Sequence, residues 1–322
     1  MNKNKSIIIL PGDIKSIFFE VFFKSLKKIN LKCPIILICC EKILFNEIKR
    51  YNYKKKINVL DLKKINKVKI KSDVINLINV SCKTIGNNKF NRKSENEYIS
   101  KTFEIAIKLI EKKISYKLLN GPINKEKFLK KKFLGITEYI SSFFKKTKTS
   151  MLIYNKKLSV SPITTHLPLK LVSKKISKEL IIEKVRIADK FYKNVLKKKP
   201  KFAVTGLNPH CESILKFNED KKIVFKAIKK LTKENIHIKG PFSTDTLFLK
   251  DNRKNYDVIV GMYHDQVLTP IKTLFEYDAI NITIGLPFLR VSPDHGTNLK
   301  MVNKNKSNPT SIIRALEFLD KH

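Results

Sequence analysis

The sequence predicts an α/β protein, because short apolar runs rich in β-branched residues alternate with segments of helical periodicity along most of its length. The chain has 322 residues, of which 42% are hydrophobic, enough to fill the cores of two domains. Polar residues, three histidines among them, follow several of the expected strands. Ligands of open α/β sheets bind beyond the ends of the strands, so these residues are candidates for a site.

In the first half, buried strands are predicted from apolar runs that polar or turn-forming residues interrupt, over residues 6–10, 34–40, 74–80 and 116–120. A helix is predicted over 15–28. A second helix is expected to open at a possible capping box, Ser94 to Glu97, and to reach about Lys113 with one apolar stripe. The polar stretch from Asn87 to Glu97 is interpreted as a loop.

The second half repeats the alternation. Strands are expected near 151–154, 158–163, 202–205, 258–260 and 279–284, and helices near 178–197, 221–233 and 310–320. No Pro/Gly/Ser-rich linker and no repeat of fixed period marks a domain boundary. Neither G-x-G-x-x-G nor G-x-x-x-x-G-K-[ST] occurs, so a nucleotide must be held in another way.

The charge is extreme, since 67 Lys and Arg against 28 Asp and Glu give +39. One interpretation is a nucleic-acid or anionic-membrane binder. The other is compositional drift. Six of the basic residues are Arg, the side chain usually selected for phosphate, and the Lys are spread from end to end. This pattern favours drift, so a nucleic-acid partner is not expected.

The five cysteines are Cys33, Cys39, Cys40, Cys82 and Cys211. Their number is odd and no C-x-x-C pair occurs, which predicts reduced, mostly buried thiols. No apolar run is long enough to cross a bilayer, and the first one breaks at Pro11-Gly12, too early for a signal peptide. We therefore expect a cytoplasmic protein without a membrane partner.

The polar residues with chemical potential lie between Asn120 and Thr297. His166, His210 and His264 each follow an expected strand, and three neutral imidazoles suit a divalent ion such as Zn²⁺ or Co²⁺ with positions left open for substrate. No short spacing links them, and each taken alone is more often a structural histidine.

Cations and carboxylates accompany the histidines. Lys272, Asn281 and Arg290 follow the third histidine and are assigned to one strand and its flanks. Arg290, retained in an Arg-poor chain, points to bidentate binding of phosphate or carboxylate, although a surface cation is an equal alternative. Asp245 and Asp265 are candidates for acid/base or histidine-orienting roles, with helix or turn caps as the alternative.

Six blocks then resemble a known family in order and spacing, over about residues 116–297: Asn120 to Lys125, Thr164 to Lys170, Gly206 to His210, Asp245 to Phe248, Met262 to Gln266, and Gly285 to Arg290 followed by Ser292 to Thr297. The chain resembles the 4-hydroxythreonine-4-phosphate dehydrogenases of pyridoxal phosphate (vitamin B6) biosynthesis. Any one block is weak evidence, whereas six in register are strong.

The resemblance implies a two-domain, three-layer fold like that of isocitrate and isopropylmalate dehydrogenases, with the active site in an interdomain cleft of a homodimer. The domains would be 1–135 with about 298–322, and about 136–297. It also implies that His166, His210 and His264 bind one divalent metal (Zn, Mg or Co), the last histidine coming from the partner subunit.

The implied substrate contacts are Thr137, Lys272, Asn281 and Arg290, and the catalytic candidates are Asp245, Asp265 and Lys272. The implied reaction is oxidation of 4-phosphooxy-threonine by NAD or NADP, followed by loss of CO₂ to give 3-amino-2-oxopropyl phosphate. A metal suits both steps, because it lowers the pKa of the alcohol and stabilises the enolate.

Three departures from the family pattern bear on activity. A substrate-contacting His is replaced by Ile136, which donates no hydrogen bond. The glycine-rich first loop keeps Gly12, Asp13 and Glu20 but gains side chains where backbone approached a ligand. The loop over 300–305 differs near the expected adenosine end, which leaves NAD or NADP open. The alternatives are a dehydrogenase of 4-phospho-threonate or 4-phospho-erythronate, and a basic binding protein that has lost catalysis.

Overall fold

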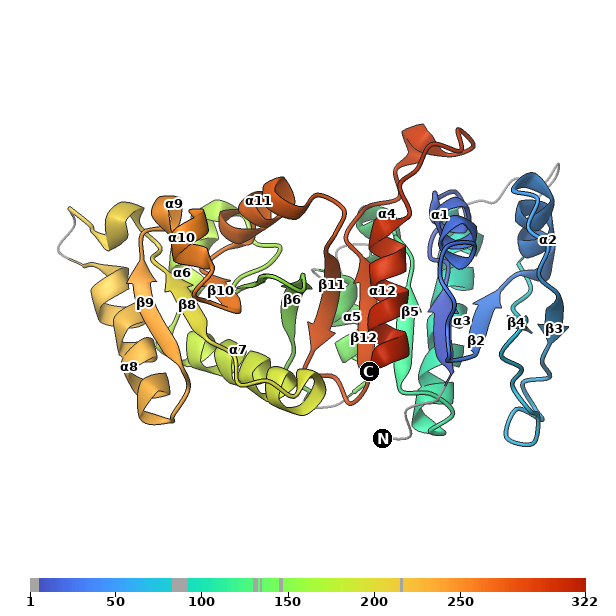
Figure 1. Ribbon diagram of the computed structural model, residues 1–322, viewed down its shortest axis with the longest axis horizontal. Coiled ribbons are helices and arrows are strands. Elements are labelled where there is room, and N and C mark those ends of the chain that lie inside the picture. Colours follow the sequence, from blue (N-terminus) through green and yellow to red (C-terminus); the bar gives the residue numbers. More distant parts are fainter. Residues whose placement is uncertain (1–5, 83–91, 130–132, 134, 145–146, 215–216) are drawn as a thin grey trace. The chain divides into compact units, whose positions relative to one another are not determined.

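The computed structural model describes residues 6–82, 92–129, 133, 135–144, 147–214 and 217–322. The chain divides into two compact units, residues 1–136 with 287–322 and residues 137–286. Each unit is a sheet with helices packed against it, so the α/β class is confirmed (Figure 1).

The first unit has a parallel sheet in the order β3-β4-β2-β1-β5-β12. Its strands are β1 (Ile7–Leu10), β2 (Ile35–Cys39), β3 (Ile57–Val59), β4 (Ile75–Asn79), β5 (Lys117–Asn120) and β12 (Leu289–Pro293). Its helices are α1 (Phe18–Leu26), α2 (Glu41–Arg50), α3 (Arg92–Glu111), α4 (Lys125–Leu129) and α12 (Thr310–Lys321). β1, β2 and β5 are buried throughout, as expected for parallel strands that are covered on both faces.

The second unit has a mixed sheet in the order β11-β6-β7-β10-β8-β9. Its strands are β6 (Ser150–Tyr154), β7 (Ser159–Pro162), β8 (Phe202–Thr205), β9 (Ile238–Phe242), β10 (Val258–Gly261) and β11 (Ile280–Ile284). Its helices are α5 (Ile136–Ser141), α6 (Val172–Lys175), α7 (Lys178–Phe191), α8 (Phe225–Lys233), α9 (Thr244–Leu247), α10 (Lys250–Arg253) and α11 (His264–Phe275). β6 is antiparallel to both of its neighbours, whereas β7, β10, β8 and β9 are parallel.

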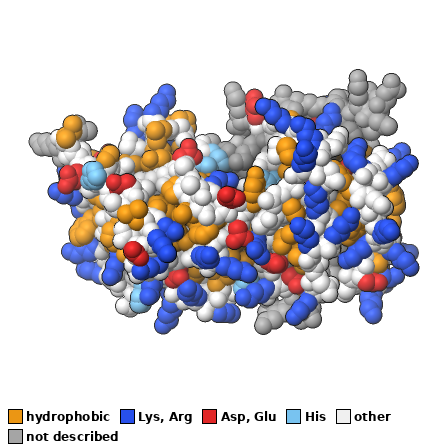
Figure 2. Space-filling view, turned by 45° about the horizontal axis from the view of Figure 1, so that its top comes forward, with side chains coloured by type: hydrophobic (Ala, Val, Ile, Leu, Met, Phe, Trp, Pro, Cys, Tyr) orange, Lys and Arg blue, Asp and Glu red, His pale blue; other side chains and the backbone are white. Residues whose placement is uncertain are grey.

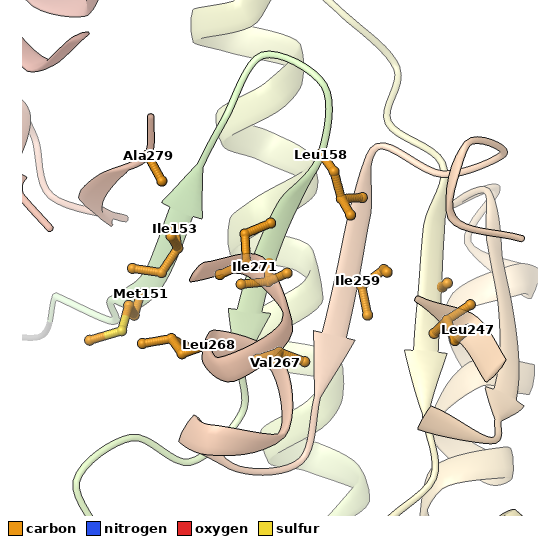
Figure 3. Close-up of a cluster of buried hydrophobic side chains, with 11 residues drawn as sticks. Met151, Ile153, Leu158, Leu247, Ile259, Val267, Leu268, Ile271 and Ala279 are labelled. Carbon is orange, nitrogen blue, oxygen red and sulfur yellow. The ribbon is translucent and has the colours of Figure 1, made fainter. Parts of the chain in front are cut away.

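The core of the second unit holds the strands that lead to the candidate site. Helix α11 lays Val267, Leu268 and Ile271 against β6, β7 and β10, where Ile153 and Ile259 are fully buried (Figure 3). This packing secures the helix that begins at His264.

Several sequence predictions need correction. Residues 92–97 belong to α3 and are not a loop, while 87–91 lie outside the described residues. The predicted helix over 15–28 begins only at Phe18, where the Ser16 hydroxyl accepts a hydrogen bond from the Phe18 amide. Strands β3, β9 and β12 and helices α2 and α11 were not predicted. Strand β3 has three residues, and α11 contains Pro270, a residue that disfavours a helix interior. The sequence of each segment taken alone is therefore weak evidence for its secondary structure.

The cysteine prediction is corrected in part. The structure pairs Cys40 with Cys82, whose Cα atoms are 6.0 Å apart, a separation typical of disulfides. Cys33, Cys39 and Cys211 form no disulfide within the described residues, and the first two are buried, as predicted. The pairing escaped the sequence because the two residues are 42 positions apart.

Basic side chains are dispersed over the face shown in Figure 2, among acidic and uncharged ones. On that face they do not gather into one stripe of the kind that nucleic-acid binders present. In the described part of the chain, no helix is both long enough and apolar enough to span a membrane.

Candidate active site

The three histidine loops meet at one edge of the second sheet. β10 pairs in parallel with β7 on one side and with β8 on the other, so the carboxyl ends of these three strands lie at the same edge. His166 follows β7, His210 follows β8 and His264 follows β10. This is the edge at which α/β sheets bind ligands.

His166 and His264 lie beside each other within one chain, with ring centroids 5.7 Å apart. His264 begins α11, and its Nδ1 lies 2.6 Å from the carboxylate of Asp265. Because a carboxylate accepts, Nδ1 of His264 is the donor of this hydrogen bond. Asp265 is itself largely exposed. Its carboxylate therefore orients the imidazole ring of His264.

His210 lies on a strained loop. Both His210 and Cys211 have left-handed backbone, with φ of 55° and 59°, which is costly for residues other than glycine. The Nδ1 atom of His210 lies 3.2 Å from the Ser243 hydroxyl, which leaves Nε2 open. Ser243 also lowers the pKa of Asp245 through a hydrogen bond, helped by the Thr246 amide and by the nearby His210. Asp245 is thus an anion at neutral pH.

The backbone before His210 is held by a residue that sequence reasoning missed. Asp220 is 1% exposed, and its carboxylate accepts hydrogen bonds from the amides of Leu207 and Asn208 and from the Asn208 side chain. A buried carboxylate directed at loop amides is a positioning device. In the sequence, the one signal for the role of Asp220 is an acidic side chain in a lysine-rich chain.

Thr137 lies in α5 and lines a pocket of about 580 Å³ within the second unit. Its hydroxyl is 3.1 Å from that of Thr283 in β11. Asn281 precedes Thr283 by two residues, so the two side chains point to the same face of β11. Asn281 Oδ1 is buried and has no partner among the described residues. A buried, unpartnered acceptor is expected where a ligand donates a hydrogen bond. Thr165, the neighbour of His166, lines the same pocket.

The assignment of Lys272, Asn281 and Arg290 to one strand and its flanks is wrong. Lys272 lies on an exposed face of helix α11, Asn281 lies in β11, and Arg290 lies in β12 of the first unit. Arg290 is not a surface cation. It is 3% exposed, and its Nε donates to Asn120 Oδ1 at 2.8 Å. The sequence predicted β11, but it predicted neither α11, which contains Pro270, nor the five-residue strand β12.

The structure shows where the residues that depart from the family pattern lie. Ile136 is buried at the start of α5 and offers no polar group. In the first loop, Ile17, Phe18 and Phe19 are buried, so these three side chains do not project from the loop as we expected. The loop over 300–305 leads to Ser307, whose amide donates to Glu20 Oε1.

The donor set suits a divalent metal only in part. His264 and His210 each present a free Nε2 with the other nitrogen bound, the arrangement that metal-binding histidines show. Within the described residues, however, one chain does not gather three His, Cys, Asp or Glu side chains close enough to hold an ion. One chain brings the rings of His166 and His264 together, and no third side chain of these types joins them in such a group among the described residues.

The chain is similar to known proteins along nearly its whole length. The model of the family described as pyridoxal phosphate biosynthetic protein PdxA matches residues 31–319. The chain belongs to the PdxA family. A PdxA relative from Sulfurihydrogenibium, 4-hydroxythreonine-4-phosphate dehydrogenase, is 36% identical over 97% of this chain and 96% of its own. A D-threonate 4-phosphate dehydrogenase from Pectobacterium atrosepticum is 34% identical over 62% of this chain.

Solved structures agree with the PdxA assignment. The 4-hydroxythreonine-4-phosphate dehydrogenase of Klebsiella pneumoniae superposes with a TM-score of 0.83 at 27% identity, covering 99% of both chains. The isocitrate dehydrogenase of Methylococcus capsulatus shares the fold, with a TM-score of 0.50 at 11% identity over 97% of this chain and 83% of its own. The resemblance drawn from six sequence blocks is therefore confirmed.

Proposed function

We propose that the chain is a 4-hydroxythreonine-4-phosphate dehydrogenase of pyridoxal phosphate biosynthesis, active in the cytoplasm. The observation that carries this proposal is the likeness to enzymes of that name along nearly the whole chain, with all three histidine loops at one sheet edge. The family is one of dehydrogenases, so a nicotinamide nucleotide is the second substrate.

In the proposed reaction, the C3–H bond of 4-phosphooxy-L-threonine breaks and its hydrogen passes as hydride to NAD or NADP, while the C3 hydroxyl gives its proton to a base. The resulting β-keto acid loses CO₂, and protonation of the enolate yields 3-amino-2-oxopropyl phosphate. Asp245, Asp265 and Lys272 are the candidates for these proton transfers. Thr137, Lys272, Asn281 and Arg290 are the proposed substrate contacts.

We place a divalent ion at the histidines. Imidazole donors favour Zn²⁺ or Co²⁺ over Mg²⁺. When bound, such an ion supplies a Lewis acid for the substrate oxygen. Since one chain brings only His166 and His264 together, we propose a homodimer in which His210 of the partner subunit completes the set. This differs from the expectation that the partner contributes His264.

Turnover tests the main proposal. Purified protein with NAD or NADP and Co²⁺ is expected to form reduced cofactor with 4-phosphooxy-L-threonine. The proposal would be overturned if the protein formed no reduced cofactor with 4-phosphooxy-L-threonine but did so with D-threonate 4-phosphate or D-erythronate 4-phosphate. D-Threonate 4-phosphate is the second candidate, because dehydrogenases of that name match part of the chain and because Ile136 removes a polar group near Thr137.

Subunit mixing tests the shared site. Inactive His166→Ala and His210→Ala chains, unfolded and refolded together, should regain about a quarter of wild-type activity, since half of the dimers are mixed and each has one intact site. His166→Ala mixed with His264→Ala should stay inactive. The reverse pattern would place His264 in the partner, as the resemblance implied.

A further inference from the structure

Gln266 follows the His264-Asp265 pair in the first turn of α11, and its side chain is 9% exposed. Both the amide nitrogen and the carbonyl oxygen of this side chain form two hydrogen bonds with the protein. Nε2 donates to the Gly206 carbonyl at 2.7 Å and to the Thr244 hydroxyl at 3.1 Å. Oε1 accepts from the Thr205 hydroxyl at 2.9 Å and from the Met262 amide at 2.7 Å.

These four bonds join three separate segments. Thr205 ends β8, and Gly206 follows it towards His210. Thr244 begins the short helix that carries Asp245, and Met262 leads from β10 to His264. The sequence separations are 61 and 60 residues to β8 and 22 to Thr244. One amide group therefore fixes the relative positions of segments that the chain itself does not connect closely.

The third histidine loop joins the same network through the backbone. The Met262 carbonyl accepts hydrogen bonds from both the amide and the hydroxyl of Thr164, two residues before His166. Met262 is thus held by Gln266 on its amide side and by Thr164 on its carbonyl side. The fit is tight, because a Cβ on Gly261 would lie 2.4 Å from Val267 and 3.2 Å from Gln266 Oε1.

We propose that Gln266 is a positioning residue of the active site, whose amide sets the placement of the His210 and His264 loops. It touches neither histidine ring in any described contact and acts through Gly206, Met262 and Thr244. The inference rests on the proposed function, since it concerns loops whose histidines are proposed as metal ligands. A misplacement of such ligands is costly, because metal affinity depends on outer-shell support.

The test compares Gln266→Met, which keeps the length and removes all four bonds, with a matched control in the other unit. Asn76 is fully buried and also makes four hydrogen bonds, to Ile35, Lys71 and Asn58. Asn76→Leu should lower thermal stability and leave the site unchanged. Thr205→Val removes only one bond to Gln266 and serves if Gln266→Met does not fold.

Two readouts are measured on the full-length protein. The first is the Co²⁺ dissociation constant, from competition with a chromophoric chelator. Gln266→Met should raise it about tenfold or more, and Thr205→Val less but in the same direction. The second is the NMR spectrum of histidine rings labelled at Cε1 in the metal-free protein, where the His210 and His264 resonances should shift and that of His322 should not.

The outcomes separate the two proposals. If the wild-type protein binds no Co²⁺, the metal assignment fails, and the histidine resonances still decide the role of Gln266. If Gln266→Met or Thr205→Val lowers stability as Asn76→Leu does, while Co²⁺ affinity and the His210 and His264 resonances stay as in the wild type, Gln266 is merely structural and the inference is overturned.

Discussion

Replacement of Asp220 by Asn tests how the loop before His210 is held. The buried carboxylate places one oxygen 2.6 Å from the Leu207 amide and the other 3.1 and 3.0 Å from the amide and side-chain nitrogens of Asn208. Asn is nearly isosteric and has a single acceptor oxygen. Either orientation of its amide turns an NH₂ group towards an N–H of the loop, so at least one backbone donor loses its partner.

The magnitude follows from the hydrogen bonds. A buried donor left without a partner costs about 1–3 kcal/mol, and loss of the charge on the acceptor weakens the remaining bonds by about 1 kcal/mol. We therefore expect Asp220→Asn to lower the free energy of unfolding by about 2–4 kcal/mol. That is a large share of the roughly 5–15 kcal/mol typical of folded proteins.

Urea denaturation followed by circular dichroism measures this change, with turnover as a second readout. Asp251→Asn is the matched control, because Asp251 is exposed and pairs with Lys254 across a solvated surface. That substitution should cost less than about 1 kcal/mol. A loss for Asp220→Asn no larger than for Asp251→Asn would refute the reasoning, since the carboxylate would then contribute nothing beyond a surface charge.

Three further predictions concern stability. Burial raises the pKa of Tyr53 to about 12, while the unfolded chain ionises near pH 10. Wild-type stability should therefore fall between about pH 10 and 12, and Tyr53→Phe should make that fall shallower in urea titrations; an unchanged alkaline limb would contradict the assignment. Gly12→Ala should cost at least about 1–2 kcal/mol, because Gly12 has φ of +80° and the new Cβ would lie 2.3 Å from the Pro122 carbonyl oxygen. Gly296→Ala, with open space around it, should change the unfolding free energy by less than about 0.5 kcal/mol, and equal effects at the two glycines would be inconsistent with the fold. Ile259→Ala should lower the free energy of unfolding by about 2–5 kcal/mol through the cavity that it leaves, and a cost below 1 kcal/mol would show that the core around β10 is loosely packed.

Much of the fold could be predicted from local pattern. Apolar runs such as 7–10, 35–39 and 258–261 are buried strands because a parallel sheet covered on both faces needs continuous apolar segments. The elements that the sequence did not predict were missed for one common reason. β3 has three residues of which none is buried, and α11 combines a proline with apolar residues, so their state depends on neighbours rather than on their own periodicity.

The candidate site, too, could be predicted from the sequence only in part. The sequence by itself placed His166, His210 and His264 after strands, since strand ends are marked locally by the change from apolar to polar residues. It also marked Arg290, through retention of an arginine among lysines. Only the tertiary structure decided that His166 and His264 are neighbours, that Arg290 is buried against Asn120, and that Asp220 and Gln266 hold the loops. These are contacts between side chains distant in sequence, and they arise from strand order and packing, which no local pattern encodes.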